Sequence, residues 1–442
     1  MRNAKFIIER LKENGYDAYV AGGAVRDMVI GVEPHDIDIV TSALPDDIER
    51  VFSDFKTLSV GKSFGVIVVM IGIVEYEIAT MRIDNINSDG RRPDSVKFTS
   101  DLAQDAERRD FTMNGIFYDP ISDKIIDFVG GKEDIKNGVV RFIGDPDSRI
   151  AEDKLRMLRG VRFAARFGSI EHESLEAIKR HAKEIHVVSK ERIQEELIKM
   201  LKVGQPRRVI NLIRDSGLMK EIIPEFMPMF TTNQSPEYHP EGVASEHTIL
   251  VMEHLVNEPI ELQLAGMLHD IGKPATTTID PVSGKISSKG HAEVGASIVM
   301  DIMVRLKFSN DMISVVTKLV HDHMKIISVV DMKKATRKKF FAEDHFSMLL
   351  KLHEADRKGG CDRTDTLEYV KGLIEEYSKE PIMPKPFIDG RDLISLGLKE
   401  GREIGRVKEY LYDMQLEGLL LDREQALWVA KEVIEKKSYP CF

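Results

Sequence analysis

Two aspartates near the start of the chain, Asp36 and Asp38, have the type and spacing of metal ligands. They alternate with Ile37 and Ile39 at the period of a β-strand, so we expect both carboxylates on one face and both isoleucines on the other. Two carboxylates on one face repel each other unless a cation lies between them, and Mg²⁺ prefers oxygen ligands. The pattern indicates a divalent-metal site, although an exposed edge strand with alternating acids would show the same spacing.

A third carboxylate could come from a later strand, predicted over residues 73–81. Glu75 and Glu77 share one face of that strand, and we favour Glu77 as the extra ligand. Two Mg²⁺ ions held in this way could activate a hydroxyl group and stabilise a leaving pyrophosphate.

A pair of glycines, Gly22 and Gly23, lies between a strand predicted over residues 18–21 and a helix predicted from Ala24. Glycine lets a phosphate approach the backbone amides, and a helix N-terminus favours an anion. Arg26 could add a charge-assisted contact to the same phosphate. The segment indicates a phosphate-binding turn, although a Gly-Gly pair by itself is more often an ordinary turn.

Two further polar segments could contact the rest of a nucleotide, one over residues 108–114 and one that begins at Glu152. On a helix, Asp153 and Arg156 would be i, i+3 neighbours that point the same way. A carboxylate acceptor beside a guanidinium donor could match the Watson–Crick edge of a base. The alternative is a surface ion pair that contributes about 0.3–0.5 kcal/mol, and Glu152 with Arg156 could form such a pair.

The second half of the chain carries histidines and aspartates at spacings that suit a metal site spread over several helices. They are His247, His269, Asp270, His291, His323 and Asp356. Neutral imidazoles together with carboxylates suit transition metals, and a metal-bound water can become a nucleophile. The alternative is that these histidines are structural and that the helical half serves only as an RNA-binding body.

The elements that must position the first set of residues alternate between strand and helix over residues 1–140. Residues 66–71 and 73–81 read as a hairpin through Gly72, and a proline with two acids from Pro45 opens a helix. We therefore expect a small head with a mixed sheet, so that the fold class of the whole chain is α+β.

From about residue 145 onward, amphipathic patterns at helical spacing continue to the C-terminus. We expect this part to be all-α, with residues 231–240 as a linker inside it. The expected division is a head over 1–140, a helical neck and body over 141–235, a second helical domain over 241–370 and a helical tail over 371–442.

Bulk composition describes a folded protein of several domains: 442 residues, of which 42% are hydrophobic and 31% charged. We find no apolar stretch that suits a membrane span and no secretory signal. The only cysteines, Cys361 and Cys441, are far apart, which suits a reducing cytosol. We expect a cytoplasmic protein. A net charge of −10 alone argues against RNA binding, but basic clusters such as that around Arg156 and Arg159 weaken this objection.

Four motifs, in this order, resemble the class II tRNA nucleotidyltransferases, which are relatives of the DNA polymerase beta superfamily. They are Gly-Gly-x-Val-Arg-Asp from Gly22, Asp-x-Asp from Asp36, Arg-Arg-Asp-Phe-Thr from Arg108 and Glu-Asp-x-x-Arg-Met-Leu-Arg from Glu152. The resemblance extends over residues 15–240. It implies a polymerase-beta-like head that adds C, C and then A to the 3′ end of tRNA from CTP and ATP.

By this resemblance, Asp36 and Asp38 would hold catalytic Mg²⁺ ions. Asp153 and Arg156 would read the base of CTP and then ATP, with Glu152 as a support. The other residues assigned to the nucleotide are Gly22, Gly23, Arg26, Arg109, Asp110, Asn114, Arg159 and Arg162. Catalysis would consist of positioning and charge neutralisation without a covalent intermediate. The implied partners are the tRNA acceptor end, CTP and ATP, and neither DNA nor a membrane.

Residues 82–101 form a polar, glycine-bearing segment that contains Arg91, Arg92 and Asp94. In the resembling family a loop at this place helps to convert the site from C to A selection, and enzymes that add only C lack it. The segment therefore disfavours a pure CC-adding enzyme. An A-adding enzyme and a poly(A) polymerase remain alternatives, because they share the head motifs.

The His-Asp doublet at 269–270 and the Gly-His-x-x-x-Gly-Ala segment at 290–296 resemble the HD phosphohydrolase superfamily. By that resemblance, His291 and His323 complete a two-metal site whose core ligands are the other four residues of the set, and His321 is disfavoured. The implied metal is a transition metal such as Ni, Mn, Co or Fe, and the implied activity is repair of damaged tRNA ends. An alternative of a different class is an HD metal phosphohydrolase whose head is only a regulatory nucleotide sensor.

Overall fold

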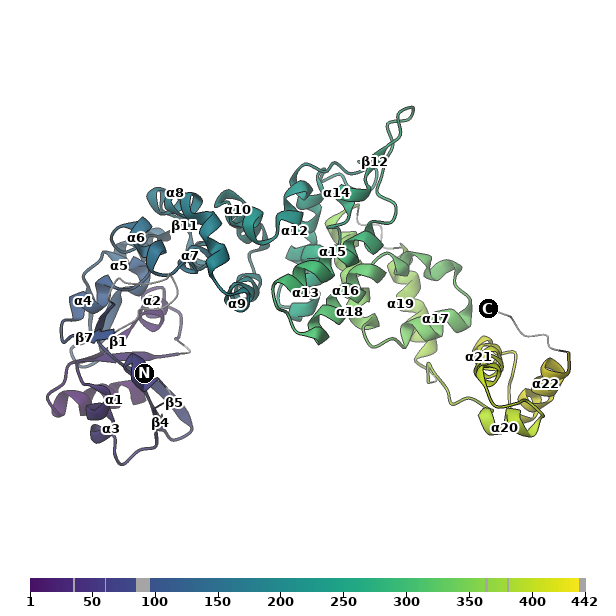
Figure 1. Cartoon of the computed structure of the whole chain (residues 1–442), viewed down its shortest axis with the longest axis horizontal. Coiled ribbons are helices and arrows are strands. Elements are labelled where there is room, and N and C mark those ends of the chain that lie inside the picture. Colours follow the sequence, from purple (N-terminus) through teal and green to yellow (C-terminus); the bar gives the residue numbers. More distant parts are fainter. Residues whose placement is uncertain (35, 60, 85–95, 362–364, 380, 437–442) are drawn as a thin grey trace. The chain divides into compact units, whose positions relative to one another are not determined.

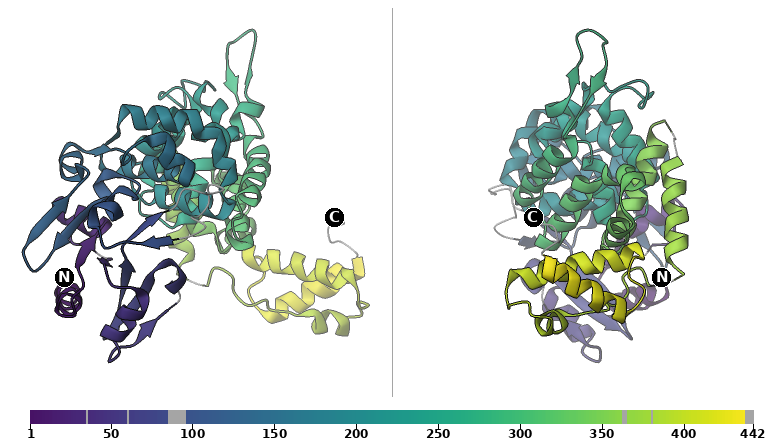
Figure 2. Two further views of the ribbon diagram at one scale, coloured as in Figure 1. Left: turned by 60° about the vertical axis from the view of Figure 1, so that its left-hand side comes forward. Right: turned by 90° about the vertical axis from the view of Figure 1, so that its right-hand side faces the viewer.

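The structure is a computed structural model that describes residues 1–442 apart from 35, 60, 85–95, 362–364, 380 and 437–442 (Figures 1 and 2). It divides into two compact units. Unit 1 comprises Met1–Pro228 with Ile302–Phe308, and unit 2 comprises Met229–Asp301 with Ser309–Phe442. Among the described helices, none is both long enough and apolar enough to cross a membrane. The division into four domains expected from the sequence stays a prediction.

Unit 1 begins with a seven-stranded mixed sheet in the order β3-β4-β5-β2-β1-β8-β9. Its strands are β1 (Ala18–Ala21), β2 (Asp38–Thr41), β3 (Thr57–Leu58), β4 (Val66–Ile71), β5 (Val74–Thr80), β8 (Ile116–Asp119) and β9 (Lys124–Asp127). The β2–β5 pair is parallel and the other pairs are antiparallel. The short pairs outside this sheet are β6 (Arg82–Asp84) with β7 (Val96–Phe98) and β10 (Val139–Val140) with β11 (Ser169–Ile170).

Local sequence explains the elements around the sheet. Gly72 joins β4 to β5 with φ +66°, a conformation that glycine adopts without steric cost. Pro45 occupies the first turn of α3, where its missing N–H leaves no helical hydrogen bond unmade. The predicted strand over 36–40 is wrong at its start, because β2 begins at Asp38 and Asp36 lies in the bend before it.

Helices make up most of the rest of unit 1. They are α1 (Arg2–Glu13), α2 (Gly23–Val29), α3 (Pro45–Val51), α4 (Leu102–Glu107), α5 (Gly131–Asn137), α6 (Pro146–Glu152), α7 (Arg156–Phe167), α8 (His172–His181), α9 (Lys190–Leu201), α10 (Pro206–Asp215) and α11 (Leu218–Ile222). The 3₁₀ turn η2 spans Thr112–Asn114. One face of α7 is buried through Met157, Val161 and Ala164, which leaves a row of arginines on its other side.

After residue 229 the described chain is helical apart from one small hairpin, β12 (Thr278–Ile279) with β13 (Ile286–Ser287). The helices are α12 (Ala244–His254), α13 (Ile260–Leu268), α14 (Lys273–Thr276), α15 (His291–Arg305), α16 (Asn310–Asp322), α17 (Lys334–Phe341), α18 (Phe346–Gly359), α19 (Asp365–Tyr377), α20 (Gly390–Ser395), α21 (Arg402–Glu417) and α22 (Arg423–Lys436). Helix α12 packs against α13 and α18, and α13 packs against α16. A mixed-sheet head followed by helices confirms the predicted fold class.

Candidate active site and metal centre

Three carboxylates meet at the edge of β2 in unit 1. Parallel pairing places Ile39 of β2 opposite Ile78 of β5, so Asp38 and Glu77 occupy neighbouring positions one residue earlier on their strands. Desolvation raises the pKa of Glu77, and the charges of Asp38 and Asp36 raise it further. Desolvation and Asp36 also raise the pKa of Asp38, against the opposing effect of Arg109. The three acids therefore repel one another, and a bound cation would relieve this repulsion.

The glycine turn lies beside this carboxylate cluster. Gly22 has φ +66° and ψ −129°, which a residue with a Cβ adopts only with strain, and α2 starts at Gly23. A Cβ at Gly22 would lie 3.1 Å from Nη1 of Arg109, so this guanidinium comes close to the main chain of the turn. Arg109 also lowers the pKa of Asp38. The Gly22 turn, the Arg109 guanidinium and the carboxylate cluster therefore lie close together.

Sequence reasoning missed the residue that holds Arg109. Asp105, in α4, is fully buried, and its two oxygens lie 2.7 Å from Nη2 of Arg108 and 3.0 Å from Nη2 of Arg109. Burial alone would raise the pKa of Asp105, but the two arginines more than offset this effect, so the pKa is lowered. The spacing of Asp105 before the arginine pair, i, i+3 and i, i+4, was the available signal.

A partly buried chain of polar side chains links α2, η2 and α7. Arg26 donates from Nε and Nη2 to Oδ1 of Asp27 at 3.0 and 2.7 Å, and from Nη1 to Oδ1 of Asn114 at 2.9 Å. Asn114 donates to Oδ1 of Asp110 at 3.0 Å, and Arg159 donates to Oδ2 of Asp110 at 2.8 Å. These five side chains hold one another in place. Arg26 has its donors engaged in this network, so its predicted triphosphate contact stays a prediction.

The continuous helix expected over Asp153 and Arg156 is wrong. Asp153 is extended, with φ −149° and ψ 106°, and it separates α6 from α7. Its carboxylate accepts from the backbone N–H of Leu155 at 3.0 Å and from Arg192 of α9 at 2.9 Å. Arg156 instead pairs with Glu152. The hydrogen bond from the N–H of Leu155 to the Asp153 carboxylate explains the break, because a side chain that bonds the backbone two residues later favours a non-helical conformation.

The remaining predicted residues of unit 1 fall into two groups. Arg162 donates to the buried Glu196 at 2.7 Å, which holds this arginine of α7 in place. Arg91, Arg92 and Asp94 lie outside the described residues.

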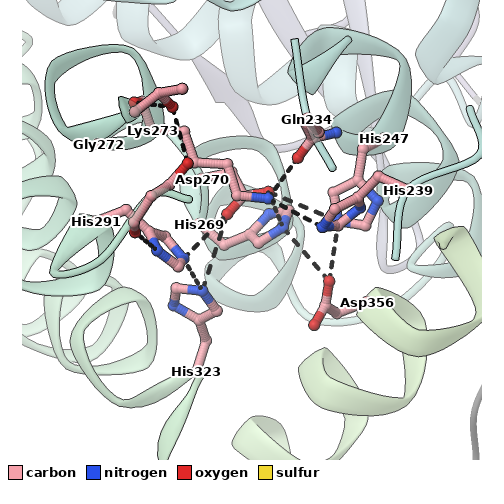
Figure 3. A network of polar contacts seen from close by, with 12 residues as sticks. Gln234, His239, His247, His269, Asp270, Gly272, Lys273, His291, His323 and Asp356 are labelled. Atoms are coloured by element: carbon pink, nitrogen blue, oxygen red, sulfur yellow. Dashed lines mark hydrogen bonds and ion pairs between the residues drawn. The ribbon is translucent and has the colours of Figure 1, made fainter. Parts of the chain in front are cut away.

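In unit 2, the structure brings all six predicted metal ligands into one buried centre (Figure 3). They are His247 in α12, His269 and Asp270 at the end of α13, His291 at the start of α15, His323 at the end of α16 and Asp356 in α18. None of these residues is more than 8% exposed. Five helices far apart in sequence thus place imidazoles and carboxylates at one point.

The ligand atoms form two groups that share Asp270. Those of His247, His269 and Asp270 lie within 4.8 Å of one another, as do those of Asp270, His291 and His323. Oδ1 of Asp356 lies 2.9 Å from Nε2 of His247. Ligands about 2.0–2.2 Å from one ion must lie within roughly 4.4 Å of each other, so each group has nearly this size.

Main-chain carbonyls orient most of the histidines. Nδ1 of His269, His291 and His323 lies 2.9, 2.7 and 2.6 Å from the carbonyl oxygen three residues earlier in each case. A hydrogen bond at Nδ1 fixes the tautomer and leaves the lone pair of Nε2 directed into the centre. Nε2 atoms of His291 and His323 face each other at 3.1 Å.

Electrostatics favour a metal over protons at His291 and His323, whereas at His247 the carboxylates of Asp356 and Glu241 overcome the effect of burial and raise the pKa to about 9. Burial, together with the nearby His269, lowers the pKa of His323 to about 3. Burial also lowers the pKa of His291, so both rings are neutral near pH 7. Nε2 of His269 is buried without a hydrogen bond among the described residues, and the nearest carboxylate oxygen, Oδ2 of Asp270, lies 3.2 Å away. Buried polar atoms in this state are costly, and a coordinated cation would satisfy them. The donor set therefore fits a metal ion.

Two glycines allow the ligand segments to meet. A Cβ on Gly272 would overlap the carbonyl oxygen of His291 and lie 2.6 Å from the backbone nitrogen of Gly295. This close approach of the segment after α13 to the first turn of α15 places Nε2 of His291 3.3 Å from Oδ1 of Asp270. A residue with a side chain at position 272 would separate the two halves of the centre.

The segment predicted as a linker contributes to the centre, and that prediction is corrected. Nζ of Lys273 lies 2.6 Å from Oδ2 of Asp270, 2.5 Å from Oε1 of Gln234 and 3.4 Å from Nε2 of His239 (Figure 3). The prolines at 236 and 240 shape a turn that carries polar side chains into the protein. Outside the centre, His321 is 55% exposed and lies 2.7 Å from Asp322, as expected for the disfavoured histidine.

A cavity of about 780 Å³ opens beside the metal centre. Its lining combines the ligands Asp270, His291, His323 and Asp356 with the cations Lys273, Lys285, Lys289 and Arg357. Lys285 and Lys289 belong to the region of the β12–β13 hairpin. Cations around ligand carboxylates and imidazoles suit a phosphate-bearing substrate.

Comparisons with known proteins agree with this arrangement. Residues 18–141 match the poly A polymerase head domain, residues 169–230 the probable RNA and SrmB-binding site of polymerase A, and residues 237–355 the HD domain. The chain is 36% identical to a CCA-adding enzyme of Staphylococcus aureus over 318 residues, which cover 71% of this chain and 70% of that protein. It is 38% identical to a CCA-adding enzyme of Ligilactobacillus salivarius over 225 residues, which span about half of each chain: 51% and 54%.

Solved structures show the same fold. The Bacillus stearothermophilus CCA-adding enzyme in complex with CTP aligns with a TM-score of 0.71 at 24% identity, over 99% of this chain and 98% of that one. The Thermotoga maritima CCA-adding enzyme complexed with tRNA aligns with a TM-score of 0.62 at 20% identity, over 98% and 95%. Together with the identity to the Staphylococcus protein over most of its length, these matches place the chain in the family of CCA-adding enzymes, nucleotidyltransferases that use divalent metal.

Proposed function

We propose that this chain adds C, C and then A to the 3′ end of tRNA, from CTP and ATP and without a nucleic-acid template. The observation that carries the proposal is the cluster of Asp36, Asp38 and Glu77 beside the Gly22 turn and Arg109. Relatives named CCA-adding enzyme, including one solved with CTP, one with ATP and one with tRNA, support these substrates.

In the proposed reaction, the terminal 3′ oxygen of tRNA bonds to the α-phosphorus of CTP or ATP. The bond from that phosphorus to the β-phosphate oxygen breaks, and pyrophosphate leaves. Mg²⁺ held by Asp36 and Asp38, with Glu77 as third ligand, would help to deprotonate the attacking hydroxyl and would neutralise charge on the pyrophosphate. Gly22 leaves the main chain open to phosphate oxygens, and Arg109, held by Asp105, offers a cation beside them.

We propose that Asp153 and Arg156 read the base of the incoming nucleotide. Each of the two side chains is held in place by an ion pair with another residue. Arg192 fixes one oxygen of Asp153 and Glu152 fixes Arg156, yet a carboxylate has further lone pairs and a guanidinium further donors for a base. Asp153→Ala should then reduce discrimination among nucleotides about 10- to 100-fold and leave metal-dependent transfer in place. An equal loss with all four nucleotides would assign the pair a structural role.

The deciding experiment uses purified protein, Mg²⁺ and three labelled tRNA transcripts: one without CCA, one without the final A and one intact. CTP and ATP are supplied singly and together, and products are separated at single-nucleotide resolution. Addition of C, C and A followed by a stop supports the proposal. Addition only to the transcript that ends in CC would indicate an A-adding enzyme, and long A tails would indicate a poly(A) polymerase. Asp36→Asn and Asp38→Asn should abolish incorporation. The cytoplasmic location stays a prediction from the cysteine count.

We propose a second function for unit 2: hydrolysis of a phosphomonoester or a 2′,3′-cyclic phosphate at damaged tRNA ends. It rests on six buried ligands beside a cavity whose lining includes Lys273, Lys285, Lys289 and Arg357. A transition metal held by His247, His269, Asp270 and Asp356, with His291 and His323 for a second ion, would supply an activated water nucleophile. The chain's own lysines would orient the phosphate.

Hydrolysis is measured with 2′,3′-cyclic AMP and with tRNA that ends in a cyclic phosphate, after loading with Ni²⁺ or Mn²⁺ or treatment with a chelator. Asp270→Ala should abolish hydrolysis and spare CTP incorporation, whereas Asp38→Asn should do the reverse. Hydrolysis that persists in Asp270→Ala would overturn the second function and leave the first intact. A head that only senses nucleotides would show hydrolysis without any incorporation.

A further inference from the structure

His247 is held differently from the other three ligand histidines. Its Nδ1 lies 2.7 Å from Oε1 of Glu241, a side-chain oxygen, instead of a main-chain carbonyl. On the opposite side of the ring, Nε2 lies 2.9 Å from Asp356 and 3.6 Å from Asp270. The ring is fully buried. This contact lacks the geometry of a hydrogen bond, so Glu241 acts on the His247 ring through its charge and close approach, whereas the backbone forms hydrogen bonds with the other three rings.

We infer that Glu241 is a positioning residue that fixes the orientation and tautomer of His247 and thereby sets the metal affinity of the centre. The inference rests on the proposed metal centre. A carboxylate at Nδ1 keeps the proton on that nitrogen, so the lone pair of Nε2 faces the metal position, and its negative charge makes Nε2 a stronger donor.

Glu241 is itself held in place. The same oxygen, Oε1, lies 2.9 Å from Nδ1 of His239, and the side chain is only 9% exposed. Oε2 is buried without a hydrogen-bond partner among the described residues, so the carboxylate is directed inward by its two imidazole neighbours. His239 in turn approaches Lys273, which contacts Asp270. A connected set of contacts thus runs from one metal ligand to another through residues that bind no metal.

The first test is Ni²⁺ binding by the full-length chain, measured by titration calorimetry in excess Mg²⁺, which occupies sites built only from oxygen ligands. Glu241→Ala should weaken Ni²⁺ binding about 10- to 100-fold, the usual effect of removing an outer partner of a ligand histidine. Glu241→Gln keeps an acceptor oxygen without the charge, so its loss should be smaller. Glu237→Ala, which removes an exposed acid from the same segment, should bind Ni²⁺ like the wild type.

A second readout separates positioning from general stability. In Co²⁺-loaded protein, the exchangeable Nδ1 proton of each ligand histidine gives a paramagnetically shifted NMR signal. In Glu241→Ala, the signal of the His247 Nδ1 proton should disappear or exchange faster with solvent. The signals from His269, His291 and His323 should remain. The melting temperature of the metal-free protein and CTP incorporation should stay close to wild type.

Wild-type Ni²⁺ affinity in Glu241→Ala would overturn this inference alone. Unfolding of unit 2 in both Glu241 variants without metal would assign Glu241 a structural role and would also overturn it. Failure of the wild-type chain to bind Ni²⁺ would overturn the metal centre itself, and this inference with it.

Discussion

A methyl group at position 272 would damage the metal centre without altering any of its six ligands. In Gly272→Ala, the added Cβ overlaps the carbonyl oxygen of His291 and lies 2.6 Å from the backbone nitrogen of Gly295. Both obstacles are main-chain atoms, so no side-chain rotation can make room. Either the segment after α13 or the first turn of α15 must move, and each movement separates His291 from Asp270, now 3.3 Å apart.

The size of the effect follows from this geometry. Overpacking usually costs about 1–3 kcal/mol, and an overlap with two backbone atoms places Gly272→Ala near the upper end. Metal–ligand distances tolerate only about 0.2 Å of error, so a shift that relieves the overlap exceeds what the centre can absorb. We expect Ni²⁺ affinity to fall at least about 10-fold, as for other losses of ligand orientation.

Urea denaturation and Ni²⁺ calorimetry measure the two effects, and CTP incorporation should remain near the wild-type rate. Gly372→Ala is the matched control, because in α19 a Cβ there meets nothing within 4 Å. It should be neutral or stabilise by up to about 1 kcal/mol through helix propensity. Wild-type stability and Ni²⁺ affinity in Gly272→Ala would refute the close approach of the two segments.

Three further outcomes are expected. His323→Ala should lose Ni²⁺ binding, whereas His321→Ala, at an exposed neighbour on the same helix, should keep it; equal affinities would exclude His323 as a ligand. In metal-free protein, the folded pKa values of His239, about 4, and His323, about 3, lie below the unfolded value near 6.5. The unfolded chain therefore binds more protons as the pH falls from about 6.5 towards 4, and each group should remove up to about 1.4 kcal/mol of stability per pH unit, as urea midpoints would show. Asp105→Asn leaves Arg109 without its buried partner, so it should cost about 3 kcal/mol and impair CTP and ATP incorporation alike; an effect on one nucleotide only would contradict this.

Sequence spacing predicted which residues of unit 2 come together better than it predicted the local geometry of unit 1. The six residues were identifiable because four of them are histidines, of which the chain has only 13, and they lie at helix ends or on a helix face with two aspartates. His239 and Glu241 were missed because the prolines around them read as a linker. A polar residue in a loop becomes buried only when the loop packs against the rest of the domain. That packing depends on contacts between residues far apart in sequence, which local spacing does not reveal.

In unit 1, the motifs pointed to the right family, but the backbone conformation predicted around Asp36 and Asp153 was wrong. Period-two alternation predicted Asp36 on a strand, but alternation cannot locate where pairing with β1 and β5 begins. Helical spacing joined Asp153 to Arg156, but the hydrogen bond of Asp153 with the Leu155 N–H and its ion pair with Arg192 favour a break. In both cases a tertiary partner outside the motif decided the backbone conformation.

The orientation of the four ligand histidines has a consequence for how this centre tolerates mutation. A main-chain carbonyl is present whatever residue occupies the position, so substitutions at Gly266, Ser288 or Val320 leave the acceptors for three rings in place. The carboxylate beside Nδ1 of His247 belongs to a side chain, so a substitution at residue 241 can remove it. In a lineage without selection for hydrolysis, a change at Glu241 could silence the centre while the fold and the polymerising head persist. The four histidines would then still be present after the proposed hydrolysis had been lost.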